Sequence, residues 1–134
     1  MKLILYRSWP GAGKSSAAQR MFPGVLLLEN DMFHMHNGVY DWHKENMPAA
    51  IDWCMNMTRM ALENGMDVIV ANTFTKRAFV DAYKKIADET GARFVVYRCT
   101  GNFKNMHGLN DKQVERFKKS MEDYPGEIVL HPDE

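Results

Sequence analysis

A glycine-containing turn near the N-terminus, between an apolar run and a helix-forming segment, constrains this chain most. The apolar run at residues 2–7 has the composition of a buried strand, and residues 14–22 favour a helix that Pro23 and Gly24 end. The turn between them reads Ser8-Trp9-Pro10-Gly11-Ala12-Gly13-Lys14-Ser15. Such a turn can wrap its backbone N–H groups around an anion at the N-terminus of the helix.

The turn matches the phosphate-loop pattern G-x-x-x-x-G-K-[ST] except at its first position, where Ser8 replaces glycine. The pattern places Lys14 to reach the β and γ phosphates of a nucleotide and the Ser15 hydroxyl to bind Mg²⁺. An ordinary strand-to-helix turn without a ligand is the alternative. The predicted nucleotide-binding residues are Pro10, Gly11, Ala12, Gly13, Lys14, Ser15 and Ser16.

The composition limits the possible classes of function but does not identify one. The chain has 134 residues, 17 basic and 17 acidic side chains, so net charge gives no argument for binding nucleic acid or a membrane. No apolar run approaches the ~20 residues of a membrane span, and Cys54 and Cys99 lie far apart, as expected of buried, reduced thiols. We expect one P-loop domain over residues 1–134, in the cytoplasm.

Further apolar runs alternate with helical patterns along the chain. Strands are predicted at residues 25–28, 67–71, 93–99 and 126–132, and helices at residues 48–64, 76–89 and from Asn110 onward, with Gln113 completing a capping box. Continuous apolar strands indicate a parallel sheet covered by helices on both faces, a three-layer, doubly wound α/β fold. The expected inward-facing helix residues are Ile51, Cys54, Met55, Thr58, Leu62, Phe79, Val80, Tyr83, Ile86, Ala87, Val114, Phe117 and Met121.

Polar segments follow several of these strands. The glycine turn and residues 29–31, 71–75 and 100–105 should therefore meet at the carboxyl edge of the sheet, where ligands bind in such folds. Residues 32–47 have no clear period and are expected to form a long loop or a partly helical excursion. Any of Trp9, Trp42 and Trp53 could stack a base, and only Trp9 is expected near the phosphates.

The segments PGAGKSS, ENDMF, VIVANTFTKRAF, CTGNFKNMHGLN and MEDYPGEIVL together resemble the polynucleotide-kinase-like P-loop ATP-binding family. This family includes phage polynucleotide 5′-kinases and phage and bacterial ATP-binding proteins. The resemblance covers nearly the whole chain. It implies an ATP- and Mg²⁺-dependent kinase with a short lid, acting on a hydroxyl of a nucleoside, a nucleotide or a polynucleotide 5′ end. If the chain is phage-encoded, its compartment is the host cytoplasm.

The resemblance also implies roles for single residues. Asp31 matches the aspartate that acts as general base on the acceptor hydroxyl, with Glu29 as a second candidate and helix capping as the alternative. Lys104, in the lid at residues 100–110, best matches the arginine that neutralises the transferring phosphoryl group, although a solvated surface position is equally consistent. Arg98 and Arg116 could take its place if the lid folds inward.

Other positions depart from the family pattern. His34 stands where the polynucleotide 5′-kinases have a phosphate-gripping arginine, and Ala71 stands where many relatives have an aspartate. Asn72, Thr73 and Thr75 could bind phosphate or acceptor, or Thr75 could cap the next helix. These departures leave open a nucleotide-binding regulator, a slow NTPase without efficient phosphoryl transfer, and a nucleic-acid-binding accessory protein.

Overall fold

The computed structural model describes residues 1–101 and 109–132. Its main sheet has 5 strands in the order β2-β5-β1-β6-β7, and each neighbouring pair is parallel. The strands are β1 (Lys2–Arg7), β2 (Leu26–Leu28), β5 (Val68–Asn72), β6 (Arg93–Cys99) and β7 (Ile128–Leu130).

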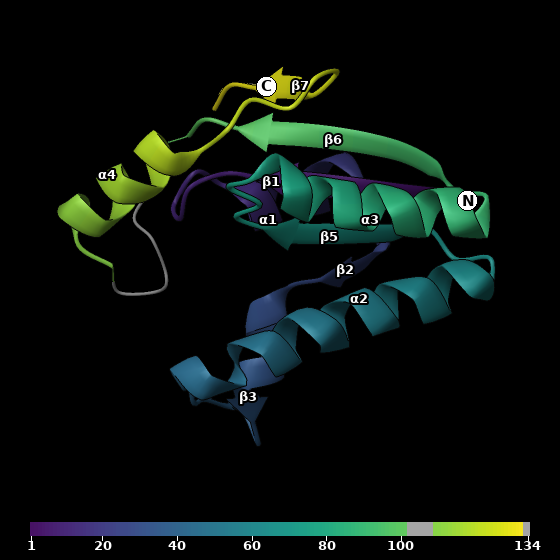
Figure 1. Ribbon diagram of the computed structural model, residues 1–134, viewed down its shortest axis with the longest axis horizontal. Coiled ribbons are helices and arrows are strands. Elements are labelled where there is room, and N and C mark those ends of the chain that lie inside the picture. The colour runs from purple at the N-terminus through teal and green to yellow at the C-terminus, as the bar shows by residue number, and fades with distance from the viewer. Residues whose placement is uncertain (102–108, 133–134) are drawn as a thin grey trace.

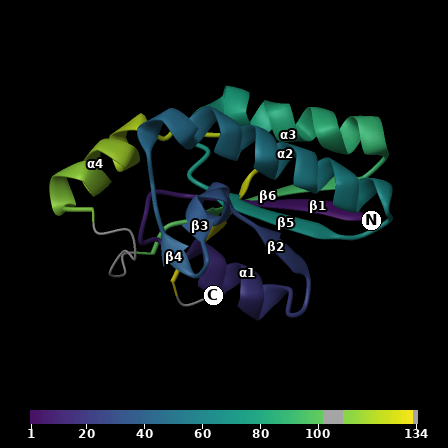
Figure 2. The ribbon, with the colours of Figure 1, turned by 90° about the horizontal axis from the view of Figure 1, so that it is seen from below.

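Helices cover both faces of this sheet, as predicted. Helix α1 (Lys14–Met21) lies on one face, and α2 (Met47–Glu63) and α3 (Arg77–Thr90) lie on the other (Figures 1 and 2). Helix α4 (Asp111–Ser120) extends beyond the carboxyl ends of the strands (Figure 1). The three-layer, doubly wound α/β fold is confirmed.

The alternation of side chains along the strands gives each face its own apolar core. Leu3 and Leu5 of β1 pack under α2 and α3, while Ile4 and Tyr6 pack under α1. Cys54 belongs to the first cluster and Cys99 to the second, and both are buried free thiols, as the sequence predicts. No helix in the described part of the chain is long and apolar enough to cross a membrane.

Residues 30–46 form a partly helical excursion, which is one of the two expected alternatives, and they also contain a hairpin that was not expected. They form the 3₁₀ helix η1 (Asn30–His34), an antiparallel hairpin of β3 (Met35–His36) and β4 (Val39–Tyr40), and the 3₁₀ helix η2 (Lys44–Asn46). Asn37 (φ 51°) and Gly38 (φ 80°) make the hairpin turn in the left-handed region, which these two residue types tolerate best. Strands this short carry no readable hydrophobic period.

Two residues predicted to face the core are exposed. Ile51 is 42% exposed, because the buried stripe of α2 runs through Ala50, one helical position earlier. Phe79 is 53% exposed, because its neighbour Val80 occupies the inward position in the first turns of α3. The predicted helices and strands agree with those observed to within two residues at either end.

The capping box predicted for α4 is present. The Asn110 side chain accepts from the Gln113 N–H at 2.9 Å, and the Gln113 side chain accepts from the Asn110 N–H at 2.9 Å. These reciprocal bonds satisfy donors that the start of a helix otherwise leaves open.

The buried Arg7 joins the end of β1 to the segment after α4. Its guanidinium donates to the carbonyl oxygens of Phe74 and Glu122, each at 2.7 Å, and to the Glu127 carboxylate at 2.8 Å. Phe74 has a left-handed backbone (φ 45°) that these bonds help to hold. Arg7 thus fixes β1 immediately before the glycine turn begins.

Candidate functional site

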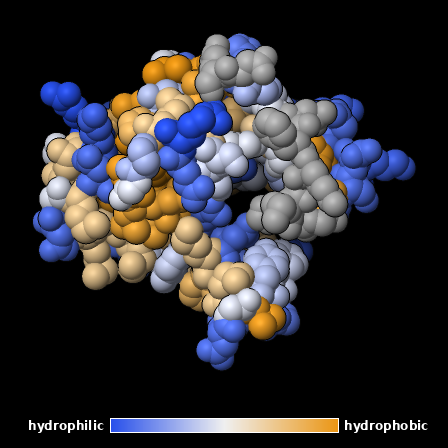
Figure 3. Space-filling view, turned by 180° about the vertical axis from the view of Figure 1, so that it is seen from behind, coloured by the Kyte–Doolittle hydropathy of each residue, from blue (hydrophilic) through white to orange (hydrophobic). Residues whose placement is uncertain are grey.

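A cavity of ≈ 920 Å³ opens at the carboxyl edge of the sheet. The space-filling view shows the molecule hollowed on this side (Figure 3). The predicted convergence is observed for the glycine turn, residues 29–31, residues 71–73 and Gly101, which all line the cavity, while residues 102–105 lie outside the described residues. Its other lining residues are Ala17, Arg20, His34, Tyr40, Trp42, Met47, Ala50, Ile51, Cys99, Gly101, Leu109, Gln113, Phe117, Leu130, His131 and Pro132.

The glycine turn has the backbone shape that an anion site requires. Gly11 (φ 85°) and Gly13 (φ 89°) both lie in the left-handed region, where other residues are strained. Gly13 is the N-cap of α1 and offers no side-chain cap, so no capping side chain covers the first N–H groups of this helix. The Gly101 N–H donates to the Ala12 carbonyl at 3.2 Å, which braces the turn against the residues after β6.

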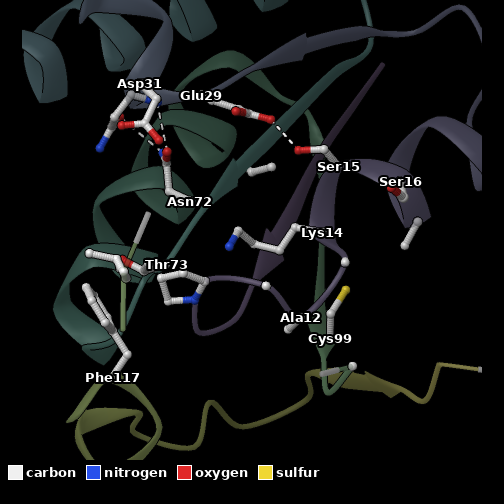
Figure 4. Close-up of a pocket in the computed structure, with 18 of the residues that line it drawn as sticks. Ala12, Lys14, Ser15, Ser16, Glu29, Asp31, Asn72, Thr73, Cys99 and Phe117 are labelled. Carbon is white, nitrogen blue, oxygen red and sulfur yellow. Dashed lines mark hydrogen bonds between the residues drawn. The ribbon is translucent and has the colours of Figure 1, made fainter. Parts of the chain in front are cut away.

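Lys14 extends into the cavity (Figure 4) and donates to the Ser8 hydroxyl at 3.1 Å. Burial lowers the pKa of Lys14, because the charged ammonium loses hydration, and the nearby Glu29 carboxylate partly offsets that shift. Ser8, the one departure from the loop pattern, therefore provides a polar partner for the lysine. No local sequence signal predicts this contact.

The Ser15 hydroxyl donates to the carboxylate of Glu29, which follows β2 (Figure 4). The contact joins the first turn of α1 to the end of the edge strand. Ser16, the next residue of α1, also lines the cavity and is exposed. In the described part of the chain, no three His, Cys, Asp or Glu side chains gather into a metal-binding group. A cation here would need other oxygen ligands besides carboxylates.

Asp31 lines the same cavity, across from Lys14 (Figure 4). The Tyr40 hydroxyl donates to its Oδ1 at 3.3 Å, and burial together with this carboxylate raises the pKa of Tyr40. Asp31 lies within η1, whose N-cap is Glu29 without a side-chain cap, so Asp31 does not cap this helix. The carboxylate is positioned between the phosphate-loop side of the cavity and the hairpin.

The end of β5 supplies amide and hydroxyl groups instead of a carboxylate. Asn72 accepts from the Asn30 N–H at 2.8 Å and donates to the Asn30 side chain at 3.1 Å, which fixes the segment that carries Asp31. Thr73 and the buried Ala71 also line the cavity. Thr75 does not cap α3, because the N-cap is Lys76 and no side chain caps it.

The basic residues that could neutralise the transferring phosphoryl group do not lie together in the structure. Arg98 binds the carboxylates of Asp123 at 2.5 Å and Glu127 at 3.4 Å, and it does not line the cavity. Arg116 also lies outside the cavity lining, and Lys104 lies outside the described residues. Arg20 lines the cavity and was missed, although it follows Ser16 by four residues on α1 and therefore shares its face.

Residues without a readable sequence pattern form the remaining wall of the cavity. His34, Tyr40 and Trp42 come from η1, β4 and the residues after β4, and Met47 and Ile51 come from the start of α2. Of the tryptophans, Trp42 thus reaches the cavity. Trp9 instead donates from its indole to the Gly101 carbonyl at 3.1 Å, with the Lys118 ammonium 5.1 Å from its ring centre.

Comparison with known proteins places this site in a family. An AAA domain model matches residues 3–123. Human NEDD4-binding protein 2 is 25% identical over 129 residues, an alignment that covers 85% of this chain. The chain spans only 7% of the length of that relative.

Solved structures share the fold at low identity. A chain of the Pnkp1/Rnl/Hen1 RNA repair complex matches with a TM-score of 0.71 and 16% identity, covering 90% of this chain and 43% of that one. A candidate kinase from Chloroflexus aurantiacus matches with a TM-score of 0.70 and 16% identity, covering 97% and 86%. The Mycobacterium tuberculosis APS kinase CysC, in complex with AMPPNP and APS, matches with a TM-score of 0.61 and 16% identity, covering 99% and 87%.

These structures show a P-loop kinase-like fold. The family match extends over nearly the whole chain and includes the glycine turn, Asp31 and Asn72. This chain belongs to the AAA domain family.

Proposed function

We propose that this chain is a P-loop kinase-like domain, over residues 1–134, that binds ATP with Mg²⁺. It transfers the γ-phosphoryl group to a hydroxyl of a nucleoside, a nucleotide or a polynucleotide 5′ end. One observation carries the proposal: the glycine turn with Lys14 and the carboxylate of Asp31 face one cavity, as a donor phosphate and an acceptor hydroxyl require. The APS kinase that shares this fold is in complex with both AMPPNP and APS.

The phosphates bind at residues 10–16. Backbone N–H groups of the turn and the positive end of the α1 dipole attract the anion, and the left-handed glycines let the chain approach it closely. Lys14 exchanges its Ser8 contact for the β and γ phosphates. The phosphates also give a strong anionic partner to the Lys14 ammonium, whose pKa burial lowers.

The residues present fit a magnesium ion, which prefers oxygen ligands and keeps several waters. Ser15 presents its hydroxyl next to the phosphate site, and Glu29 is in direct contact with that hydroxyl. Ser15 would hold the ion, and Glu29 would orient Ser15 or a water of the ion. Mg²⁺ neutralises charge on the β and γ phosphate oxygens when it is bound.

Asp31 is the proposed general base. Its carboxylate takes the proton of the acceptor hydroxyl as the oxygen attacks the γ phosphorus, and the Tyr40 hydroxyl fixes its orientation. Lys104 supplies positive charge from the lid, and Arg20 adds a guanidinium on the cavity wall. The protein does little covalent chemistry in such a transfer, so the rate depends on the positioning of the reactants and on compensation of their charge.

Ala71 favours a second candidate, a nucleotide-binding regulator or slow NTPase. This residue, at the carboxyl end of β5, offers no carboxylate to support the metal. If Glu29 does not replace this missing carboxylate, ATP would bind and hydrolyse slowly, without efficient transfer of its phosphoryl group to an acceptor.

Incubation with γ-labelled ATP and a panel of acceptors distinguishes the two. The panel contains nucleosides, nucleoside monophosphates, 5′-hydroxyl oligonucleotides and sugar acids. Label on an acceptor, lost in Asp31→Asn, supports the kinase. Labelled free phosphate without any labelled acceptor supports the slow NTPase, and neither product, together with no ATP binding, rejects both.

A further inference from the structure

Aromatic rings line the acceptor side of the cavity. His34 is 3% exposed, and the rings of Tyr40 and Trp42 lie with their centres 6.2 Å and 6.4 Å from it. The β3–β4 hairpin creates this grouping, because it turns the chain back and brings Tyr40 and Trp42 over η1. We refer to His34, Tyr40 and Trp42 as the aromatic wall.

Large apolar side chains of this region remain exposed to the cavity. Tyr40 and Trp42 are each 47% exposed, and Met47 and Ile51, which line the cavity from α2, are 43% and 42% exposed. Contiguous exposed apolar surface in a cleft marks a binding site, since ordinary folding would cover it. The surface suits a ligand with a flat apolar face.

The charged side chains that line the cavity limit the class of ligand further. Among the described residues that line the cavity, Asp31 is the carboxylate that contacts the aromatic wall, and the lysine and arginine, Lys14 and Arg20, both stand on α1. Recognition of phosphate groups relies on Arg and Lys contacts. A wall with aromatic rings and one carboxylate disfavours an acceptor that brings its own phosphates.

His34 also presents an unmet hydrogen-bonding capacity. Its Nδ1 is buried and has no partner among the described residues. A buried polar atom without a partner is unfavourable, so a ligand with a hydrogen-bonding edge against His34 would gain from supplying one. A nucleobase combines such an edge with a flat apolar face.

We propose that the aromatic wall binds the base of an uncharged nucleoside, stacked against Trp42 and Tyr40, with a sugar hydroxyl toward Asp31. This inference rests on the proposed function and names its acceptor. The acceptor oxygen forms a bond to the γ phosphorus while the bond from that phosphorus to the β–γ bridging oxygen breaks. Asp31 takes the hydroxyl proton, and the products are ADP and a nucleoside monophosphate.

Calorimetric titration of nucleosides tests the proposal, with the protein free and saturated with Mg²⁺ and AMPPNP. Adenosine, guanosine, cytidine and thymidine are compared with a nucleoside 3′-monophosphate, a 5′-hydroxyl oligonucleotide and gluconate. We expect at least one nucleoside to bind more tightly than these three ligands. Trp42→Ala should weaken that nucleoside about tenfold or more, since stacking on an aromatic ring contributes strongly to base binding.

Phe79→Ala is the matched control, because Phe79 is a similarly exposed aromatic residue on α3 outside the cavity. It should leave nucleoside affinity unchanged. In steady-state transfer, Trp42→Ala should raise KM for the nucleoside far more than it lowers kcat. Trp42 is exposed, so its replacement should not compromise folding.

The outcomes separate the two proposals. Tighter binding of the oligonucleotide, the 3′-monophosphate or gluconate, or an unchanged affinity in Trp42→Ala, overturns the nucleoside assignment while ATP binding stands. No nucleoside binding in either state of the protein also overturns it. Nucleoside binding that depends on Trp42 but occurs without any AMPPNP binding supports the aromatic wall and rejects the kinase.

Discussion

The carboxylate of Glu29 accepts a hydrogen bond from the hydroxyl of Ser15, so the end of β2 meets the first turn of α1. Ala71, at the end of the adjacent strand β5, brings no carboxylate to this place. We therefore propose that Glu29 supports the magnesium ion in place of an aspartate at position 71.

Glu29→Gln should weaken the contribution of Mg²⁺ to ATP binding by about 10–100-fold, the usual effect of losing a group that orients a metal ligand. ATP affinity measured by calorimetry in EDTA should change little. The exposed Glu63→Gln, at the end of α2, controls for loss of a carboxylate. If the Mg²⁺ dependence of Glu29→Gln equals that of the control, Glu29 has no part in the metal site.

Asp31→Asn should slow phosphoryl transfer by about 10²–10⁴-fold, because the amide cannot take the acceptor proton. ATP affinity should stay close to that of the unmodified chain, since the phosphate loop is untouched. Single-turnover transfer of γ-labelled phosphate gives the rate, and Asp52→Asn, an exposed position on α2, is the control. Unchanged turnover in Asp31→Asn would remove this carboxylate from the mechanism.

Nucleotide binding should take up protons at alkaline pH. Burial lowers the pKa of Lys14 in the free protein, and bound phosphates favour its charged form, so binding raises that pKa. ATP affinity should therefore fall as pH rises through the pKa of the free lysine, at a pH below the ordinary 10.5. Calorimetry at several pH values between neutrality and 10.5, in buffers of different ionisation enthalpy, measures the uptake. Release of protons, or no exchange up to the ordinary lysine pKa, would contradict the prediction.

Glu127→Ala should strongly destabilise the fold. It leaves the guanidinium of Arg7, which is 0% exposed, without its carboxylate partner at 2.8 Å. Removal of one member of a buried ion pair costs about 3–5 kcal/mol, whereas an exposed pair contributes about 0–1 kcal/mol. Glu115→Ala, which breaks the exposed pair with Lys118 at 3.3 Å, is the matched control. Urea unfolding of both variants measures the difference, and equal losses would show that the Arg7 pair is not a main support.

The fold could be predicted because its signals are local. Each strand of the parallel sheet is a continuous apolar run, and turns at Gly24, Gly65 and Gly91 separate strands from helices. The signal for the phosphate loop is equally local, because the turn requires a left-handed backbone at Gly11 and Gly13, which glycine adopts without strain. These features can be predicted without knowledge of contacts between distant segments.

The rest of the site depends on contacts between distant segments. The bond from Ser15 to Glu29 joins α1 to the end of β2, and the pairing of Asn30 with Asn72 joins the ends of β2 and β5, which are neighbours only in the folded sheet. Ile51 was assigned to the core because helical periodicity cannot tell a cavity wall from a packed face. The aromatic wall could not be predicted from the sequence, because a hairpin with strands of only two residues brings its side chains together.

Calorimetric titration of ATP with Mg²⁺ into the chain and into Lys14→Ala tests the central claim most directly, with circular dichroism to show that both are folded. We predict a saturable heat for the unmodified chain and none for Lys14→Ala, with equal dichroism spectra. No heat with any common nucleoside triphosphate, or equal affinity in both proteins, would contradict nucleotide binding by the glycine turn.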